Sequence, residues 1–434
     1  MHLPFTKTTL ANGLDVIVHE HHTSPLVAVS VWYHVGSKNE RRGLTGLAHL
    51  FEHLMFEGSA HHPTGYFEPL QEAGAAVNGS TSTDRTNYWE VVPKPAMRRA
   101  LWMEADRMGW LLPALTPARF ETQRIVVLNE RRQSYENRPY GLASFALHQA
   151  LFPHEHPYSW PTIGETADLH TASVDDARAF FERYYHPGNA SVAVVGDVDT
   201  DETLDLVAGL FGDIPGGRDV PAVVAPHVPA RARRLVLEDR VPLARLYLAW
   251  PSPPLFADGD AELDLVAEVL ASGKTSRLYR ALVYEQRIAT EIAASQNSRE
   301  LGSFFQIVAT AAPGRTLAEV ERAIMKEIAV LFERGPTPLE LERCLAQAEA
   351  HFLFRLQTVG GFGGKSDQLN AYNVFLGDPG YFERDLIRYR TATAAHLRAA
   401  AIKYLQPSAR VVLSVVPRGR VALALTGSRS VAVS

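Results

Sequence analysis

The feature that most limits how this chain can fold is an internal repeat. The segment TASVDDARAFFERYYHPGNASVAVV begins at Thr171, and TATAAHLRAAAIKYLQPSARVVLSVV begins at Thr391. At this offset of 220 residues, Pro187 aligns with Pro407 and the apolar runs that follow coincide. Self-similarity at a long fixed period indicates a duplicated structural unit. We therefore expect two homologous α+β domains of about 210 residues each, which is an ordinary domain size.

A second pair of segments repeats at nearly the same offset. Thr116 followed by Pro117, and Thr337 followed by Pro338, are both typical of a helix that begins at the proline. Glu340 completes a capping box in the second copy. The two pairs of segments have offsets that agree within one residue, which favours duplication over chance.

The stretch IPGGRDVPAVVAPHVPARAR separates the two copies and lacks any periodicity. It is rich in proline, glycine and alanine, which indicates a connection between domains. We therefore expect an N-terminal domain at residues 1–218, a linker at 219–233 and a C-terminal domain at 234–434.

Strand and helix patterns alternate in the first domain. Residues 14–36 and 77–92 are rich in β-branched and aromatic residues and predict strands. Residues 44–56 place Leu47, Leu50, Phe51 and Leu54 at helical spacing. Thr45 is the expected N-cap of that helix.

This predicted helix contains the motif H-x-x-E-H, formed by His49, Leu50, Phe51, Glu52 and His53. Residues four apart lie on one helix face, so both histidines can bind one cation. A catalytic zinc site uses three protein ligands and leaves one position open. Glu52 can then act as general base without being a ligand. The motif is short enough to recur by chance, but histidines in an apolar helix need polar partners, which favours a metal site.

The composition limits the partners and the compartment. The formal net charge of −5 provides no basic field for nucleic acid. No apolar run is long enough for a membrane span. The N-terminus lacks the pattern of a signal peptide, and Cys344 is the only cysteine, so we expect a reducing compartment, the cytoplasm.

Several segments resemble one known family over nearly the whole chain. They are GLAHLFEHLMFEGS from Gly46, VNGSTSTDRTNYWEVVP from Val77 and YYHPGNASVAVVGDV from Tyr184. They are similar to segments of the pitrilysin, insulin-degrading enzyme and mitochondrial processing peptidase family, in its short-subunit bacterial branch. That family has its third zinc ligand 77 residues after the second histidine, and Glu130 has this spacing from His53. The resemblance implies one Zn²⁺ per subunit, bound by His49, His53 and Glu130.

The resemblance also implies an architecture and a substrate. Each subunit would contain two α+β domains, each a mainly antiparallel sheet packed with helices, and would form half of a clamshell around a closed chamber. Small or unfolded peptides would enter and pair with an edge strand by β-augmentation. Asn78, Gly79 and Ser80 match the peptide-contacting positions of that strand, with glycine where the family usually has alanine.

The sequence departs from the family at three further positions. Gln123 stands seven residues before Glu130, where the family usually has a second acid. The family's second domain carries an arginine and a tyrosine that hold the substrate, but Val283 and Thr290 occupy these positions. We therefore expect the zinc-bearing catalytic subunit of a heterodimeric endopeptidase. A homologous, metal-free partner would supply the arginine and tyrosine, and the second domain of this chain would be catalytically silent.

Three alternatives stay open. The chain could be a non-catalytic structural or assembly subunit, or a homodimer of low activity, and manganese or cobalt could replace zinc. The segment GGFGGKS (residues 360–366) matches a phosphate-binding loop only in part, because the first glycine of that motif would fall at Val359. We expect a loop there and assign it no role.

Overall fold

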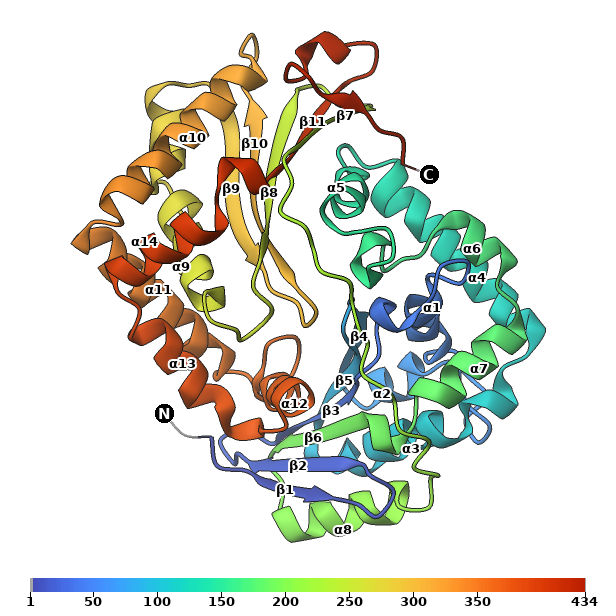
Figure 1. Cartoon of the computed structure of the whole chain (residues 1–434). Coiled ribbons are helices and arrows are strands. Elements are labelled where there is room, and N and C mark those ends of the chain that lie inside the picture. The colour runs from blue at the N-terminus through green and yellow to red at the C-terminus, as the bar shows by residue number, and fades with distance from the viewer. Residues whose placement is uncertain (1–2, 434) are drawn as a thin grey trace. The chain divides into compact units, whose positions relative to one another are not determined.

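The computed structural model describes residues 3–433, which divide into two compact units (Figure 1). The first unit comprises residues up to 129 together with 161–223 and 351–384. The second comprises residues 130–160, 224–350 and those from 385 onward. Each unit thus includes a segment from the other half of the sequence, whereas the expected domains were continuous. Residues 215–232 contain no helix or strand, and they include all of the expected linker at 219–233 except Arg233, which begins β7.

The sheet of the first unit has six strands in the order β1-β2-β6-β3-β5-β4. The strands are β1 (Thr6–Thr9), β2 (Asp15–Glu20), β3 (Leu26–Tyr33), β4 (Ala76–Thr81), β5 (Thr86–Pro93) and β6 (Ala190–Gly196). Neighbouring strands are antiparallel except β2 and β6, which are parallel. The sheet is therefore mixed but mainly antiparallel, and β4 forms one of its edges.

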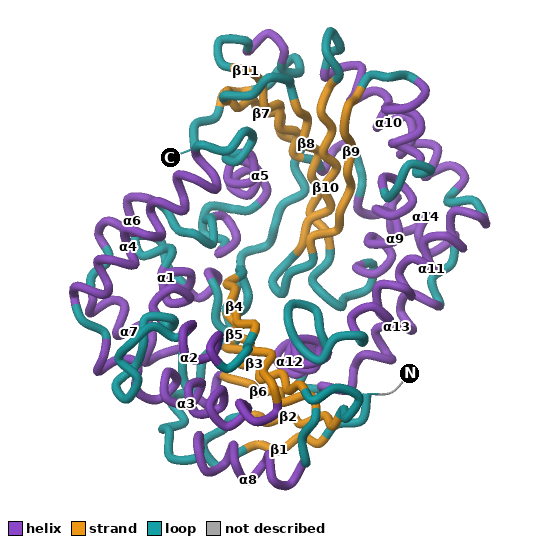
Figure 2. The backbone as a smooth tube through the Cα atoms, turned by 180° about the vertical axis from the view of Figure 1, so that it is seen from behind, coloured by secondary structure: helices purple, strands orange, loops and turns teal. Residues whose placement is uncertain are grey.

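Helices cover both faces of this sheet. They are α1 (Leu47–Leu54), α2 (Phe67–Glu72), α3 (Met97–Ala114), α4 (Pro117–Arg131), α6 (Thr166–Thr171), α7 (Val174–Tyr184), α8 (Thr200–Phe211) and α12 (Lys365–Leu376). The alternation of side chains along β5 shows the two faces, because Glu90 points toward α3 and Asn87 toward α12. The central strand β6 is buried along its whole length and contacts α12 (Figure 2). Burial on both faces explains why its sequence is a continuous run of apolar and small residues.

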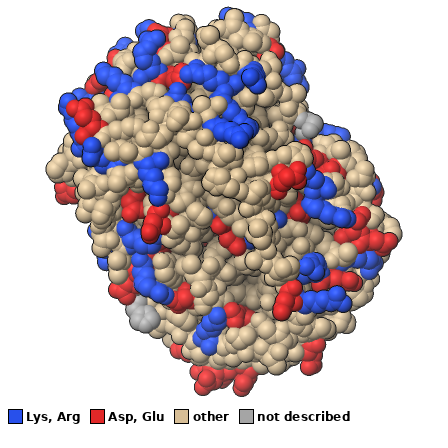
Figure 3. All heavy atoms as spheres, viewed as in Figure 1, with Lys and Arg blue, Asp and Glu red and all other residues tan. Residues whose placement is uncertain are grey.

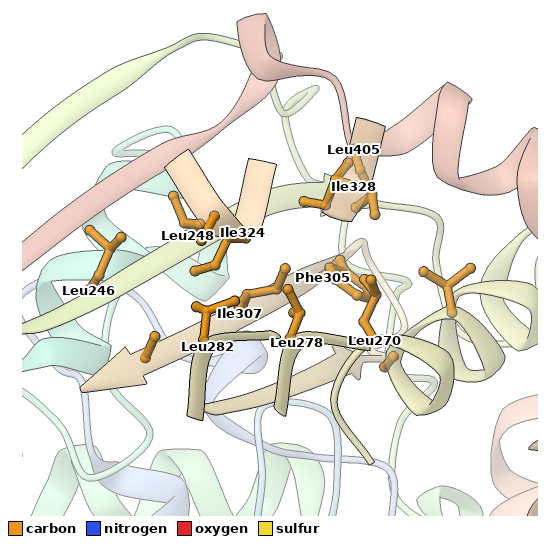
Figure 4. Packing of buried hydrophobic residues seen from close by; sticks show 14 of the residues in the cluster. Leu246, Leu248, Leu270, Leu278, Leu282, Phe305, Ile307, Ile324, Ile328 and Leu405 are labelled. Carbon is orange, nitrogen blue, oxygen red and sulfur yellow. The ribbon is translucent and has the colours of Figure 1, made fainter. Parts of the chain in front are cut away.

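The second unit has the strand order β12-β7-β11-β8-β10-β9, in which the five strands from β7 to β9 repeat the order from β2 to β4. The outer strand differs, because β12 comes last in the chain and is parallel to β7, whereas β1 comes first and is antiparallel to β2. The strands are β7 (Arg233–Asp239), β8 (Arg245–Ser252), β9 (Ala289–Asn297), β10 (Ser303–Ala311), β11 (Val411–Pro417) and β12 (Arg429–Ser430). The helices are α5 (Ala143–Leu151), α9 (Asp260–Ala271), α10 (Leu317–Arg334), α11 (Pro338–Arg355), α13 (Phe382–Arg390) and α14 (Ala394–Tyr404), of which α11 and α13 cross the unit boundary. Figure 4 shows Leu248 of β8 packed near Ile324 of α10 within the main apolar core.

The predicted duplication is confirmed element by element. Helix α7, a short 3₁₀ turn at Pro187–Asn189 and strand β6 follow one another in the first copy. Helix α14, a 3₁₀ turn at Pro407–Ala409 and strand β11 follow in the same order in the second. The predicted α+β class, with two mainly antiparallel sheets packed with helices, is likewise confirmed.

The predicted helix starts are also confirmed. In the capping box of α11, the backbone N–H of Thr337 donates to the Glu340 carboxylate at 2.7 Å, and the N–H of Glu340 donates to the Thr337 hydroxyl at 3.3 Å. Helix α4 begins at Pro117, as expected, and the Thr116 hydroxyl accepts a hydrogen bond from the N–H of Arg119. None of the helices described combines the length and hydrophobicity that crossing a bilayer would need.

Candidate metal centre

Helix α1 begins at a backbone turn that only glycine adopts easily. Gly46 is its N-cap, with φ of +94°, and a Cβ atom there would lie 2.8–2.9 Å from Leu169, Gly164 and Ile163. The Glu40 carboxylate accepts hydrogen bonds from the N–H groups of Gly46 at 2.9 Å and Ala48 at 2.8 Å. These bonds satisfy backbone donors that the start of a helix leaves unpaired.

The expectation that Thr45 caps α1 was wrong. Its hydroxyl donates to Asp168 at 2.7 Å instead, and it also accepts a hydrogen bond from the N–H of Glu165. Thr45 therefore fixes the loop before the helix to α6, while Glu40 performs the capping.

The apolar face of α1 is buried through Leu47, Ala48, Leu50, Phe51 and Leu54. The side chains between them, His49, Glu52 and His53, are only partly buried. The imidazole centroids of His49 and His53 lie 4.9 Å apart with the ring planes at 75°. The helix thus fixes its apolar side in the protein and presents the motif residues at the opposite side.

Glu130 joins the two histidines from α4, where Val127 and Leu128 are buried and hold the helix in place. One ligand atom from each of His49, His53 and Glu130 lies within 4.8 Å of the other two. Ligands of a tetrahedral zinc ion are roughly 3.4 Å apart, so small side-chain rotations suffice to close the set. Two imidazoles and one carboxylate form a donor set that suits a catalytic zinc ion.

Glu52 does not belong to this group of three ligands. It lies on the same helix, between the two histidines in sequence, and is partly exposed. Its negative charge is close enough to Arg85 to raise the pKa of that guanidinium, which burial lowers more strongly. A carboxylate outside the ligand set but beside it has the placement that a general base needs.

Gln123 lies seven residues before Glu130 on α4, about two helical turns away, and is buried. Its side-chain amide donates a hydrogen bond of 2.6 Å to the carboxylate of Glu57. An acid at position 123 would face this carboxylate and repel it. The contact with Glu57 therefore explains the glutamine, and this contact could not be read from the sequence.

Strand β4 carries the three residues expected to contact a peptide. Asn78 pairs with Trp89 and Ser80 pairs with Asn87 across the β4–β5 ladder, and α1 packs against β4. The other side of β4 has no partner strand among the described residues, so β4 is an edge with which an added strand could pair. The Gly79 N–H donates to the Asn78 side chain at 2.8 Å, a bond that an added strand would have to replace if it pairs with that N–H. A Cβ atom on Gly79 would lie 3.0–3.2 Å from neighbouring atoms that include the Tyr88 and Phe56 rings, so an alanine here would need these neighbours to shift by a few tenths of an ångström.

Arg85 is a further residue that sequence reasoning missed. Its guanidinium donates to the Ser80 carbonyl at 2.8 Å and hydroxyl at 2.6 Å, and it lies over the Trp32 ring at 5.1 Å. Because it follows the turn between β4 and β5, it fixes the end of the edge strand. The sequence contains no periodic signal for such a contact.

Val283 and Thr290 take part in the packing and hydrogen bonding of the second unit. Val283 is part of a π-helical turn (Tyr279–Glu285) and packs against the apolar core of the second unit. Thr290 belongs to β9, and its hydroxyl lies 3.5 Å from the Thr310 carbonyl. Neither side chain can replace an arginine or a tyrosine as a donor to substrate.

The charge on the surface is mixed. On the face drawn in Figure 3, lysine and arginine side chains are interspersed with aspartate and glutamate. This pattern gives no single basic field of the kind that binds a phosphate backbone.

Comparisons with known proteins extend this picture. Residues 15–163 match the family described as Insulinase (Peptidase family M16), and residues 171–348 match the Peptidase M16 inactive domain. The chain is 31% identical over 369 residues to Zinc protease PqqE of Helicobacter pylori, covering 82% of this chain and 81% of that protein. It is 26% identical over 251 residues to the mitochondrial-processing peptidase subunit beta of Blastocladiella emersonii, covering 57% and 53% of the two chains.

A solved structure gives the same result for the fold. The crystal structure of a protease from Helicobacter pylori has a TM-score of 0.88 at 26% identity, and the match covers 96% of this chain and all of that one. The family resemblance expected from the sequence is thereby confirmed. With two family matches that together span most of the chain and a relative 31% identical over four-fifths of it, the chain belongs to peptidase family M16.

Proposed function

We propose that this chain is a zinc-dependent endopeptidase that hydrolyses small or unfolded peptides. The observation that carries the proposal is the convergence of His49, His53 and Glu130, whose ligand atoms lie within 4.8 Å of one another. Among the described residues this is the one group of three metal-binding side chains that comes so close. Relatives named zinc proteases support the same metal.

Each residue at the site receives a role from its placement. Zinc, when bound by the three ligands, supplies Lewis-acid chemistry for peptide hydrolysis. Glu52 takes the proton from the attacking water and delivers it to the leaving amine. The open edge of β4, at Asn78, Gly79 and Ser80, binds the peptide backbone as an added strand. Gln123, seven residues before Glu130 on α4, is assigned a supporting role and donates its hydrogen bond to Glu57.

The proposed enzyme is the catalytic subunit of a heterodimer. Val283 and Thr290 provide no arginine or tyrosine, so a homologous, metal-free subunit would supply both and complete a clamshell-shaped chamber. The similarity to a protein named as a subunit of mitochondrial-processing peptidase supports an assembly of this kind. We place the chain in the cytoplasm because its single cysteine suits a reducing compartment.

One experiment tests the metal and the base together. The purified chain, alone and with its co-purifying partner, is assayed for bound zinc and for cleavage of a quenched fluorescent peptide. Glu52→Gln should retain one zinc per chain and lose turnover by several orders of magnitude, because only the proton acceptor is removed. Normal peptide cleavage by this variant would contradict the assigned base.

The second candidate is a non-catalytic structural subunit, favoured by Val283, Thr290 and Gln123. A scaffold has no need of a complete ligand set and an adjacent base, which argues against it. The two candidates differ in metal content: a scaffold would purify fully folded without stoichiometric zinc, and no partner would restore peptide cleavage.

A further inference from the structure

The glycine-rich segment before α12 forms a hydrogen-bonded loop. The N–H groups of Lys365 and Ser366 donate to the carbonyls of Thr358 and Val359, each at 3.1 Å. The N–H of Gly363 donates to the Asp367 carboxylate at 2.7 Å. The bonds at both ends close the loop on itself, so it forms a defined platform.

This loop lies directly on the sheet of the first unit. A Cβ atom on Gly360 would lie 2.5 Å from the Ala28 side chain and 2.9 Å from that of Val91, so only glycine allows the approach. Gly361 has φ of +84°, which also favours glycine. The glycines therefore let the loop backbone reach the sheet and determine where Phe362 is placed.

Asp367 fixes the loop to the strands beside the edge. Its carboxylate accepts hydrogen bonds from the Trp32 indole at 2.9 Å and the Asn87 amide at 3.1 Å. Burial raises the pKa of Asp367, while its bond to Gly363 and the charge of Arg85 lower it. Asn87 in turn pairs with Ser80 on β4, so the loop and the edge strand share one hydrogen-bonded network.

Phe362 is held at the exposed end of this loop. Its side chain is 52% exposed, and its ring lies 5.4 Å from that of Trp89 at an interplanar angle of 85°. Trp89 stands opposite Asn78 on β4, and paired residues of an antiparallel ladder point to the same face. The aromatic pair therefore lies on the face of the sheet that carries Asn78, one strand in from the open edge.

We infer that Phe362 and Trp89 form a subsite that binds a large apolar side chain of the peptide paired with β4. This inference rests on the proposed function and gives the glycine-rich loop a role in it. Strands lie about 4.8 Å apart, so the backbone of an added strand would be roughly 9.6 Å from β5. Only a long side chain that leans over Asn78 can span that distance, which selects aromatic or large aliphatic residues at the position facing Asn78.

A simpler reading is that Phe362 only covers Trp89, since single exposed apolar residues are common. The two readings differ in what removal of the ring changes. If Phe362 only covers Trp89, removal of its ring should change the binding of all peptides equally or of none. As a subsite, it would affect only peptides that carry a large apolar side chain at one position.

The test measures peptide binding in the assembly that the cleavage assay finds active, with Glu52→Gln present to prevent turnover. Fluorescein-labelled variants of one cleaved peptide carry phenylalanine or alanine at each position in turn. We expect one position where phenylalanine binds about tenfold more tightly than alanine, and Phe362→Ala should abolish that preference. Phe362→Leu should restore part of it, and Leu339→Ala, which removes an exposed side chain at the start of α11, should leave it unchanged.

The possible failures are distinguishable. A preference for phenylalanine that survives in Phe362→Ala would overturn the subsite. Cleavage by Phe362→Ala with Glu52 intact would show that the enzyme itself is unaffected. If no peptide is cleaved by the chain in any assembly, the proposed function itself is refuted.

Discussion

His156 links the stability of the second unit to pH through a contact that protonation would break. It is fully buried, packs against Phe152 and Tyr158, and its Nδ1 accepts a hydrogen bond of 3.0 Å from the backbone N–H of Tyr158. Only a neutral imidazole has a bare nitrogen for this bond. Burial, and secondly the charge of Arg299, lower the pKa of His156 to about 4.

The direction and size of the effect follow from the two pKa values. The unfolded chain binds a proton at this histidine as the pH falls below about 6.5, whereas the folded chain binds it only near pH 4. The free energy of unfolding should therefore be unaffected above pH 6.5 and fall by about 2–3 kcal/mol between pH 6.5 and 4.5 through this residue alone. Burial also lowers the pKa of His148, which adds a loss in the same direction.

The assay compares His156→Asn with the wild-type chain by urea unfolding at pH 6.5, 5.5 and 4.5, with metal removed by a chelator. Asparagine keeps a side-chain oxygen that can accept from Tyr158 but does not titrate. The variant should lose the part of the pH dependence that His156 provides, whatever its stability at pH 6.5. His396→Asn, at an exposed position on α14, is the control and should keep the full slope. An equal decline in His156→Asn and wild type would refute the reasoning.

Other substitutions test the site and the fold. Glu130→Ala should remove stoichiometric zinc without unfolding the chain, as measured by elemental analysis and circular dichroism. Gly46→Ala should destabilise by about 3 kcal/mol in urea, because a left-handed residue gains a Cβ atom against packed backbone; an unchanged midpoint would contradict this. Gln123→Glu should cost about 1–2 kcal/mol at pH 7 by facing Glu57, and less once acid neutralises the pair. Thr337→Ala should cost about 1 kcal/mol through the lost cap of α11.

The sequence predicted those features that depend on local pattern. The repeat at Thr171 and Thr391 indicated two copies of one unit, and both copies have the same order of helix, turn and strand. The pair His49 and His53 could be placed on one helix face because four residues make slightly more than one turn of an α-helix. These predictions needed no knowledge of which elements meet in space.

Contacts between segments that are distant in the sequence could not be predicted from the residue pattern alone. Glu130 is one of many glutamates on helices, and only the family spacing distinguished it. Glu40 caps α1 from six residues before Gly46, so the threonine nearest the helix start was the natural but wrong choice. Residues 351–384 pack with the first unit because α12 covers the sheet of that unit. The residue pattern of α12 does not indicate which of the two sheets the helix covers.

The two copies also show where the proposed activity resides. The sheets share the order of five of their six strands, so each has an edge strand in the same place, β4 in the first and β9 in the second. Within residues 3–433, only the first copy has a helix with two histidines against that edge, and the family match of the second half is described as an inactive domain. Duplication therefore preserved the backbone of both copies while the chemistry depends on a few side chains of one. An edge strand alone can pair with a peptide, but under the proposed function cleavage of that peptide would also require the three ligands and the base that we assign to α1 and α4.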